Sequence, residues 1–158
     1  VSRWIGPPSH VFAQSAVFET ERPDPAINGY RECTVPDSVH ILTQTPSGAR
    51  GVYHLSGTTL FGPGKQIHLY GSRGTIKIIF GLREQVFVGH HGHAELKEID
   101  IPQQDRSGWR VEAEFIGAIR GQEAVKYTTF DDAVKYMEFT EAVARSAEKK
   151  VAVKLPLV

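Results

Sequence analysis

Three histidines within four positions are the residues of this sequence whose spacing most readily suggests chemistry. They are His90, His91 and His93, in the segment VFVGHHGHAELKEI. Imidazole is a common zinc ligand, and a catalytic zinc ion needs three protein ligands about 2.0–2.2 Å from one point. In an extended strand, adjacent side chains point to opposite faces. His90 and His91 should therefore diverge, whereas His91 and His93 can share a side.

The glycines beside these histidines favour a turn over a metal centre. Gly89 and Gly92 are typical of the tip of a hairpin, where glycine permits a tight backbone. A metal ion would need further ligands from remote positions such as His54 or His68, and no HExxH or Cys/His pairing supports one. We therefore predict a solvated hairpin tip and no metal site. A metalloenzyme, and a loop that contacts substrate or a partner, are the alternatives.

Other catalytic and cofactor motifs fail on spacing. The segment GTTLFGPGKQ, residues 57–66, lacks the first glycine and the final Ser or Thr of a phosphate loop, and it leads into a strand. The sequence contains neither the GxGxxG turn of dinucleotide-binding domains nor a GxSxG nucleophile elbow. A catalytic thiol needs a nearby base. We do not assign that role to Cys33, which lies in the loop-like segment GYRECTVPDS.

The composition is that of an ordinary globular chain and argues against several partners. The 158 residues are 41% hydrophobic and 23% charged, and 18 Lys and Arg balance 18 Asp and Glu. Because there is no clustered positive surplus, we expect neither nucleic acid nor an anionic membrane as a partner. The single cysteine excludes an intramolecular disulfide and indicates a reducing, cytoplasmic location. No apolar run approaches the roughly 20 residues that a membrane span needs.

Alternating hydrophobicity and turn residues predict three consecutive hairpins. Their strands are expected at residues 38–45 and 50–59, 65–72 and 74–80, and 84–90 and 94–101. Consecutive hairpins form an antiparallel sheet, because parallel strands would need long helical crossovers. Nearer the N-terminus, we expect a strand within residues 10–20 and a loop at residues 21–32.

A change of period after Pro102 predicts two helices. The first lies within GWRVEAEFIGAIRG and ends at Gly121. The second follows Thr129, a suitable N-cap, and ends near Lys149 and Lys150, whose charges suit a helix C-terminus. Its expected apolar face consists of Ala133, Val134, Met137 and Ala144 together with Phe130 and Val143. Residues 151–155 alternate like a closing strand.

These elements predict a single α+β domain over residues 1–158. We expect a mostly antiparallel open sheet with the two helices near the C-terminus packed on one face. The other face of the sheet then needs a partner or polar side chains.

Several local phrases, in their order, resemble one protein family. YGSRGTIKI resembles the "yGs.Gti.l" hairpin in the C-terminal domain of the glucose–fructose oxidoreductase / inositol dehydrogenase (Gfo/Idh/MocA) family. PDSVHILTQTPSGARGVYHLS resembles the strand pair of that domain, which an acidic residue introduces. The ending, from EFIGAIRG through FTEAVARSAEKKVAVKLP, is similar to its "F..aI.g" helix, its "eA...Sa" helix and its "v.v.lP" strand. The resemblance covers roughly residues 35–156.

The resemblance implies a fragment of an NAD- or NADP-dependent oxidoreductase. Members carry an N-terminal Rossmann domain, and the C-terminal domain forms one wall of the substrate cleft and commonly uses its sheet for oligomer contacts. Their chemistry is hydride transfer to or from a hydroxyl-bearing carbon, often of a sugar or polyol. The Rossmann half and the helix that carries the catalytic histidine are missing here. Neither His10 nor His40 has the helical Asp-x-Gly-x-His context, so we assign no catalytic residue.

We therefore expect a domain that binds substrate and oligomerises but is inactive alone. A chain that begins with Val1 rather than Met suits a piece of a longer protein. Candidate substrate-binding residues are Lys65, Arg106 and Trp109, which belong to irregular segments. The alternative is that Lys65 and Arg106 are solvated and that Trp109 packs in the core. No cofactor is expected in this chain itself, and the alternative function is a stand-alone, non-enzymatic binding or scaffold module.

Overall fold

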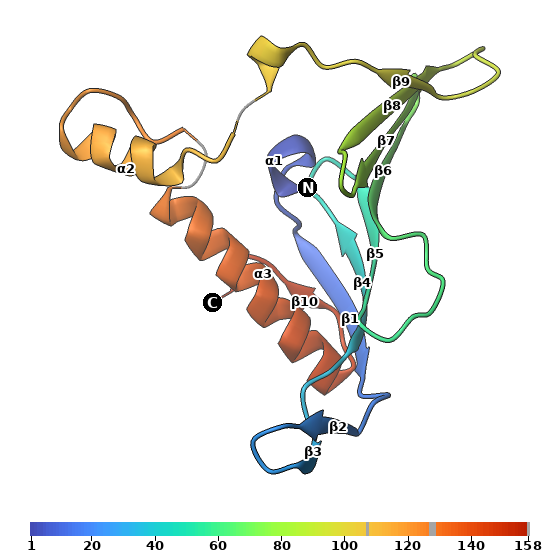
Figure 1. The fold of residues 1–158 in the computed structure, drawn as a ribbon. Coiled ribbons are helices and arrows are strands. Elements are labelled where there is room, and N and C mark those ends of the chain that lie inside the picture. The colour runs from blue at the N-terminus through green and yellow to red at the C-terminus, as the bar shows by residue number, and fades with distance from the viewer. Residues whose placement is uncertain (107, 127–128, 158) are drawn as a thin grey trace. The chain divides into compact units, whose positions relative to one another are not determined.

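The protein has an α+β fold of antiparallel sheets, with its main helices toward the C-terminus (Figure 1). The computed structural model describes residues 1–106, 108–126 and 129–157. The chain divides into two compact units, of which the first comprises Val1–Thr59 and Val111–Val158 and the second Leu60–Arg110. Among the described residues, no helix is both long and apolar enough to cross a membrane.

The first unit contains a four-stranded sheet in the order β10-β1-β4-β5. Its strands are β1 (His10–Ala16), β4 (Ser38–Gln44), β5 (Arg50–Ser56) and β10 (Val153–Lys154). The predicted hairpin of residues 38–45 and 50–59 is confirmed, with Ser38 opposite Ser56 and Gln44 opposite Arg50. The predicted closing strand is confirmed as well, because β10 pairs antiparallel with β1.

The first unit also contains three helices and a small hairpin. The helices are α1 (Ser2–Ile5), α2 (Val111–Ile119) and α3 (Phe130–Lys149). The loop predicted at residues 21–32 is wrong, because β2 (Glu21–Asp24) and β3 (Gly29–Glu32) pair with each other. Pro23 is tolerated in β2, because a two-stranded sheet consists of edges only, where a missing N–H is tolerated.

Helix α3 packs against β1 and β10 of this sheet. Its N-terminus is capped as predicted: the Thr129 hydroxyl accepts a hydrogen bond from the Asp132 backbone N–H at 3.1 Å, and the Asp132 carboxylate accepts from the Thr129 N–H at 3.3 Å. The reciprocal pair satisfies donors that the first helical turn leaves unpaired. Among the described residues, α2 has no comparable contact with the sheet, so the prediction that both helices pack on it holds for α3 only.

The predicted apolar face of α3 is largely wrong. The residues that pack on the core are Phe139, Val143 and Ala147, beside the buried Ala142 and Ser146. Of the predicted face, only Val143 belongs to this set, whereas Phe130, Val134 and Met137 are 86%, 59% and 67% exposed. Ala144 is exposed too, and Ala133 is half-buried. The fully buried positions of the helix are the small residues Ala142 and Ser146, which allow its backbone to approach the strands closely.

Among the described residues, the buried hydrophobic core lies within this first unit. Its buried apolar residues are Val11, Ala13, Ile41 and Ala142. Ser146 is the buried polar link between them: its hydroxyl accepts a hydrogen bond from the Ala13 N–H at 2.8 Å and donates to the Val151 carbonyl at 2.6 Å. This one side chain therefore ties α3 both to β1 and to the segment before β10.

The second unit is an antiparallel meander in the order β6-β7-β8-β9. Its strands are β6 (Lys65–Gly71), β7 (Gly74–Phe80), β8 (Gln85–His90) and β9 (Lys97–Ile99), followed by the short 3-10 helix η1 (Gln103–Asp105). Both predicted hairpins are confirmed, although β9 is shorter than residues 94–101. The single open sheet that we expected is thus present as separate sheets, one in each unit, besides the β2–β3 hairpin.

Candidate functional site

The three histidines lie at the end of β8 and in its connection to β9. His90 is the last residue of β8, and a turn follows at His91 and Gly92, where Gly92 has a φ of 90°. The His91 N–H donates to the Arg73 carbonyl at 3.0 Å, so the connection is tied to the neighbouring β6–β7 turn. The predicted glycine-flanked hairpin tip is confirmed.

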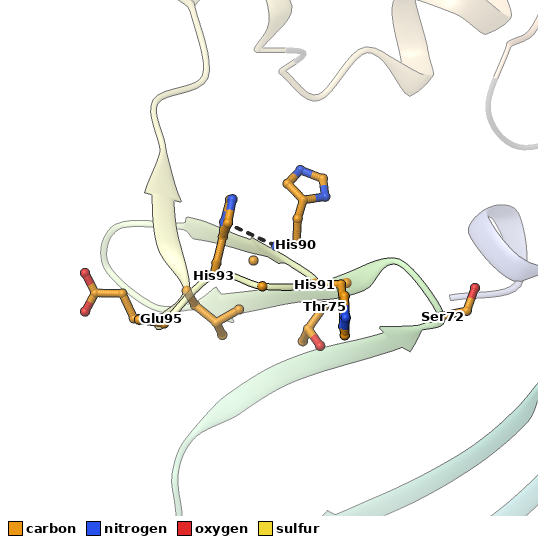
Figure 2. A pocket seen from close by; sticks show the side chains of 12 residues that line it. Ser72, Thr75, His90, His91, His93 and Glu95 are labelled. Carbon is orange, nitrogen blue, oxygen red and sulfur yellow. Dashed lines mark hydrogen bonds between the residues drawn. The ribbon is translucent and has the colours of Figure 1, made fainter.

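The histidine rings do not converge on one point (Figure 2). His90 and His93 lie on the same side, with ring centroids 5.5 Å apart, and the His90 N–H donates to His93 Nδ1 at 3.4 Å. His91 points away from them. The pairing of His91 with His93 that strand geometry predicted is therefore wrong, because the turn at His91 and Gly92 interrupts the alternation of the strand.

A hollow of about 420 Å³ lies among these hairpin ends. Its lining combines imidazoles with hydroxyls and one carboxylate: Ser72, Thr75, His90, His91, His93 and Glu95. Across the residues that the structure describes, no group of three His, Cys, Asp or Glu side chains is placed to hold a metal ion. These side chains can form hydrogen bonds with a polar ligand. This is the chemistry that a loop in contact with substrate or a partner, one of the alternatives drawn from the sequence, would need.

Two motif glycines shape this part of the sheet. Gly74 lies opposite His90, and a Cβ at Gly74 would collide with the Gly89 backbone. A Cβ at Gly89 would itself lie 2.8 Å from the Leu96 side chain. Gly74 and Gly89 therefore allow close approach of the chain, which is a structural role.

The candidate substrate-binding residues Lys65 and Arg106 engage different partners. Lys65 begins β6, and its Nζ lies 4.7 Å from the centre of the Phe80 ring across the strand pair. The Arg106 guanidinium donates to the Ile101 carbonyl at 2.8 Å and pairs with Asp100 at 3.3 Å, so it closes the segment after β9. Both side chains remain exposed.

Trp109 is 81% exposed. The alternative in which it packs in the core is therefore wrong for this chain. Its assignment to a substrate-binding wall stays a prediction, as do those of Lys65 and Arg106.

The carboxylates with lowered pKa values serve structure. Backbone N–H groups of Glu19 and Phe18, with a smaller contribution from Arg22, hold the pKa of Asp37 below its ordinary value. The pKa of Asp132 is lowered by its hydrogen bonds from Thr129. Asp37 is the acidic residue that introduces the strand pair in the family phrase, and it fixes the chain where β1 ends.

Sequence reasoning missed a buried carboxylate and a histidine pair. Glu114 in α2 is 4% exposed and accepts a hydrogen bond from the Lys126 N–H at 3.1 Å. No local pattern marks it, because its partner follows an irregular segment. His40 and His54 stand directly opposite each other on β4 and β5. The predicted turn at PSGA would place Thr45 opposite Arg50 and His40 opposite Leu55. The observed register is shifted by one residue, with Gln44 opposite Arg50, so the hairpin signal alone could not have found the pair.

The described residues contain no Rossmann-type site for a nicotinamide dinucleotide. Every strand pair in the structure is antiparallel. The Rossmann site needs parallel strands joined by a helix, with a glycine-rich turn at the helix N-terminus. The chain offers no such unit within its described residues, and its sequence contains no GxGxxG.

Comparison with known families confirms the resemblance to the Gfo/Idh/MocA family. The model of the GFO/IDH/MocA C-terminal domain matches residues 1–77. The match includes the strand-pair phrase and most of YGSRGTIKI, and it extends the resemblance toward the N-terminus. A comparison with curated proteins finds no match.

Solved structures of oxidoreductases share the fold. An NAD binding oxidoreductase from Klebsiella pneumoniae matches with a TM-score of 0.80 and 18% identity over 99% of this chain and 48% of its own. Levoglucosan dehydrogenase in complex with NADH and L-sorbose matches with a TM-score of 0.76 and 20% identity, over 99% of this chain and 47% of its own. Aldose-aldose oxidoreductase from Caulobacter crescentus, complexed with glycerol, matches with a TM-score of 0.71 and 21% identity, over 98% of this chain and 44% of its own. The chain thus spans about half the length of these structures.

Proposed function

We propose that this chain is the substrate-binding and oligomerisation domain of an NAD(P)-dependent oxidoreductase and is inactive by itself. The observation that carries the proposal is the match of residues 1–77 to the GFO/IDH/MocA C-terminal domain. The NADH in the levoglucosan dehydrogenase complexes supports NAD or NADP as the cofactor of the full-length protein. The single cysteine supports a cytoplasmic location.

The proposed substrate is a small sugar- or polyol-like molecule. The ligands in complexes of the similar structures, L-sorbose, levoglucosan and glycerol, support this class. The role of the domain would be positioning, since holding a reacting carbon against the cofactor supplies much of the rate in hydride transfer. Lys65, Arg106 and Trp109 are the proposed contacts, because their side chains are exposed polar or aromatic groups on irregular segments or at a strand end.

The proposed oligomerisation surface is one face of the β6–β9 sheet. Side chains two residues apart share a face, and so do residues opposite each other on paired strands. The register therefore gathers seven apolar side chains, which we call the apolar face of the second unit: Ile67, Leu69, Ile76, Ile78, Val86, Val88 and Ile99. Within the described residues 60–106 and 108–110, no α-helix covers it. A continuous apolar sheet face that no helix of its own unit covers favours a partner.

The test begins with the coding sequence before Val1. A strand–GxGxxG–helix unit should precede this chain, and a start codon near Val1 without such a unit would sink the oxidoreductase assignment in favour of a stand-alone module. The long protein should bind NADH, measured by fluorescence titration, and reduce NAD⁺ or NADP⁺ with a sugar or polyol. The 158-residue chain alone should do neither.

In the long protein, Lys65→Ala and Arg106→Ala should raise KM for the substrate more than they change the Kd for NADH. Lys77→Ala, on a neighbouring strand of the same sheet, is the matched control. Equal effects of the three substitutions would contradict the proposed contacts while leaving the oxidoreductase assignment intact.

A further inference from the structure

Two histidines face each other on the sheet of the first unit. His40 on β4 and His54 on β5 are register partners, and both side chains are exposed. Their ring centroids lie 4.4 Å apart with an interplanar angle of 38°. Ile41, the neighbour of His40, is buried in the core. Because successive side chains alternate between faces, the histidine pair stands on the opposite, outer face of the sheet.

The ring nitrogens of this pair are not engaged by other groups. Across the described residues, neither ring takes part in a hydrogen bond or an ion pair, and their contact with each other is the interaction that the structure records. His68 provides the contrast: its Nδ1 lies 2.8 Å from the Tyr70 hydroxyl and its Nε2 lies 3.2 Å from the Gln66 amide oxygen. His40 and His54 therefore keep their lone pairs available.

The surroundings of the pair are uncharged. On β1, the residue opposite His40 is Gln14. The adjacent rows of the same face pair Leu42 with Val52 and Ser38 with Ser56. A cation bound between the rings would thus meet no Lys or Arg in the neighbouring rows. The two hydrogen-bonded strands also hold both side chains near each other before any ligand arrives, which lowers the entropic cost of binding.

We propose that His40 and His54 form a two-imidazole site for a divalent transition-metal ion of the Zn²⁺, Ni²⁺ and Cu²⁺ class. Neutral imidazole nitrogens suit these ions. The two rings supply two ligands, so further positions on the ion stay open to water or to a ligand from another molecule. The site is separate from the His90–His93 hairpin, and it does not depend on the proposed oxidoreductase function.

The experiment is a titration of the tag-free chain with Zn²⁺, followed through the ring ¹H–¹³C NMR signals of each histidine. The His40 and His54 signals should move together, with one common midpoint. In His54→Ala, the midpoint of the His40 response should rise on the order of a hundredfold, because the second ligand no longer binds intramolecularly. His40→Ala should have the reciprocal effect on His54.

His68→Ala is the matched control, since both nitrogens of His68 already have partners, and it should leave the common midpoint unchanged. Amide spectra of each variant check that the sheet is intact, which the exposure of both histidines favours. An unchanged His40 midpoint in His54→Ala would overturn the proposal. So would silence of both rings up to the highest Zn²⁺ concentration at which the chain stays folded and in solution.

Discussion

Asp37 determines the path of the chain where β1 ends. Its side chain is 4% exposed, and its carboxylate accepts hydrogen bonds from the backbone N–H groups of Phe18, at 3.0 Å, and Glu19, at 2.8 Å. Arg22 lies 3.7 Å away. Hydrogen bonds to the charged form favour ionisation, which is why the pKa of Asp37 is lowered, chiefly by Glu19.

The lowered pKa of Asp37 predicts acid sensitivity with a defined sign. The unfolded chain takes up a proton at this carboxyl at a higher pH than the folded chain does. Its contribution to the free energy of unfolding is therefore complete above the ordinary carboxyl range and is lost as pH falls through the folded pKa. Asp37→Asn should lower stability at neutral pH and flatten the loss of stability as pH falls below the ordinary carboxyl range.

Urea unfolding at a series of pH values measures this effect. The pKa of Asp132 is also lowered, so the Asp37→Asn variant should still lose part of its stability as the pH falls. Glu84→Gln is the control, since Glu84 is exposed and the structure gives its carboxylate no hydrogen bond. Parallel acid curves for Asp37→Asn and the parent chain would show that the carboxylate does not make this contribution.

At the level of single residues, the sequence predicted positions better than roles. The family phrases contain Gly74, Asp37 and Ser146, and each has a structural role: close backbone approach, a cap on backbone N–H groups, and a bridge from α3 to β1. Burial of a serine is not visible in a periodicity, because the alternation rule assigns polar residues to solvent. The contacts made by Lys65 and Arg106 could not be predicted either, since they depend on the strand register and on the course of a loop.

Among the elements, hairpins were predictable and faces of helices were not. Strand alternation and the turn residues Pro46 and Gly48 define the β4–β5 hairpin locally. Helix α3 carries apolar residues nearly all round, so two stripes compete for the core. The stripe of Phe139, Val143 and Ala147 prevails. The small side chains and the Ser146 hydroxyl on that side fit the strands. This fit depends on the helix and the sheet together, so the sequence of the helix alone does not reveal it.

The choice between these stripes gives a paired prediction for α3. Phe139 packs on the core, with its ring centroid 6.2 Å from that of Tyr53. Phe139→Ala should lower the free energy of unfolding by about 2–4 kcal/mol, less than a fully buried phenylalanine because the ring is only half-buried. Met137→Ala, two positions away on the exposed side, should change it by no more than about 0.5 kcal/mol.

Urea unfolding of the 158-residue chain followed by circular dichroism measures both variants. Helix propensity contributes little to the difference, since both substitutions introduce alanine. A larger loss for Met137→Ala than for Phe139→Ala would restore the face that we first predicted from the sequence.

Across the whole molecule, the two units differ in how they are stabilised. The buried apolar core belongs to the first unit, where α3 covers a sheet. The second unit is a meander that carries a continuous apolar face. A sheet that is apolar on one face needs a second layer. The sequence predicted a sheet face that needs either a partner or polar side chains, and the face of the second unit carries apolar side chains; a partner on it stays a prediction.

Self-association of the chain through the apolar face of the second unit is the prediction at this scale. Sedimentation velocity at high protein concentration, with a chelator present to exclude metal-linked association, should show a dimer or larger species. Ile76→Glu should shift the chain to monomer, because Ile76 is 39% exposed on that face and a carboxylate there would have to be desolvated in the interface. Ile99→Glu repeats the test on β9, an edge strand of the sheet, where a substitution is less apt to disturb folding.

The matched control is Lys77→Glu. Lys77 is the next residue on β7, and its side chain points to the opposite face of the sheet. It should leave the association unchanged, although it alters the net charge by more than Ile76→Glu does. If Lys77→Glu dissociates the assembly and Ile76→Glu does not, the interface lies on the opposite face of the sheet, which carries Lys77. A chain that sediments as a monomer at every concentration would contradict self-association through the apolar face.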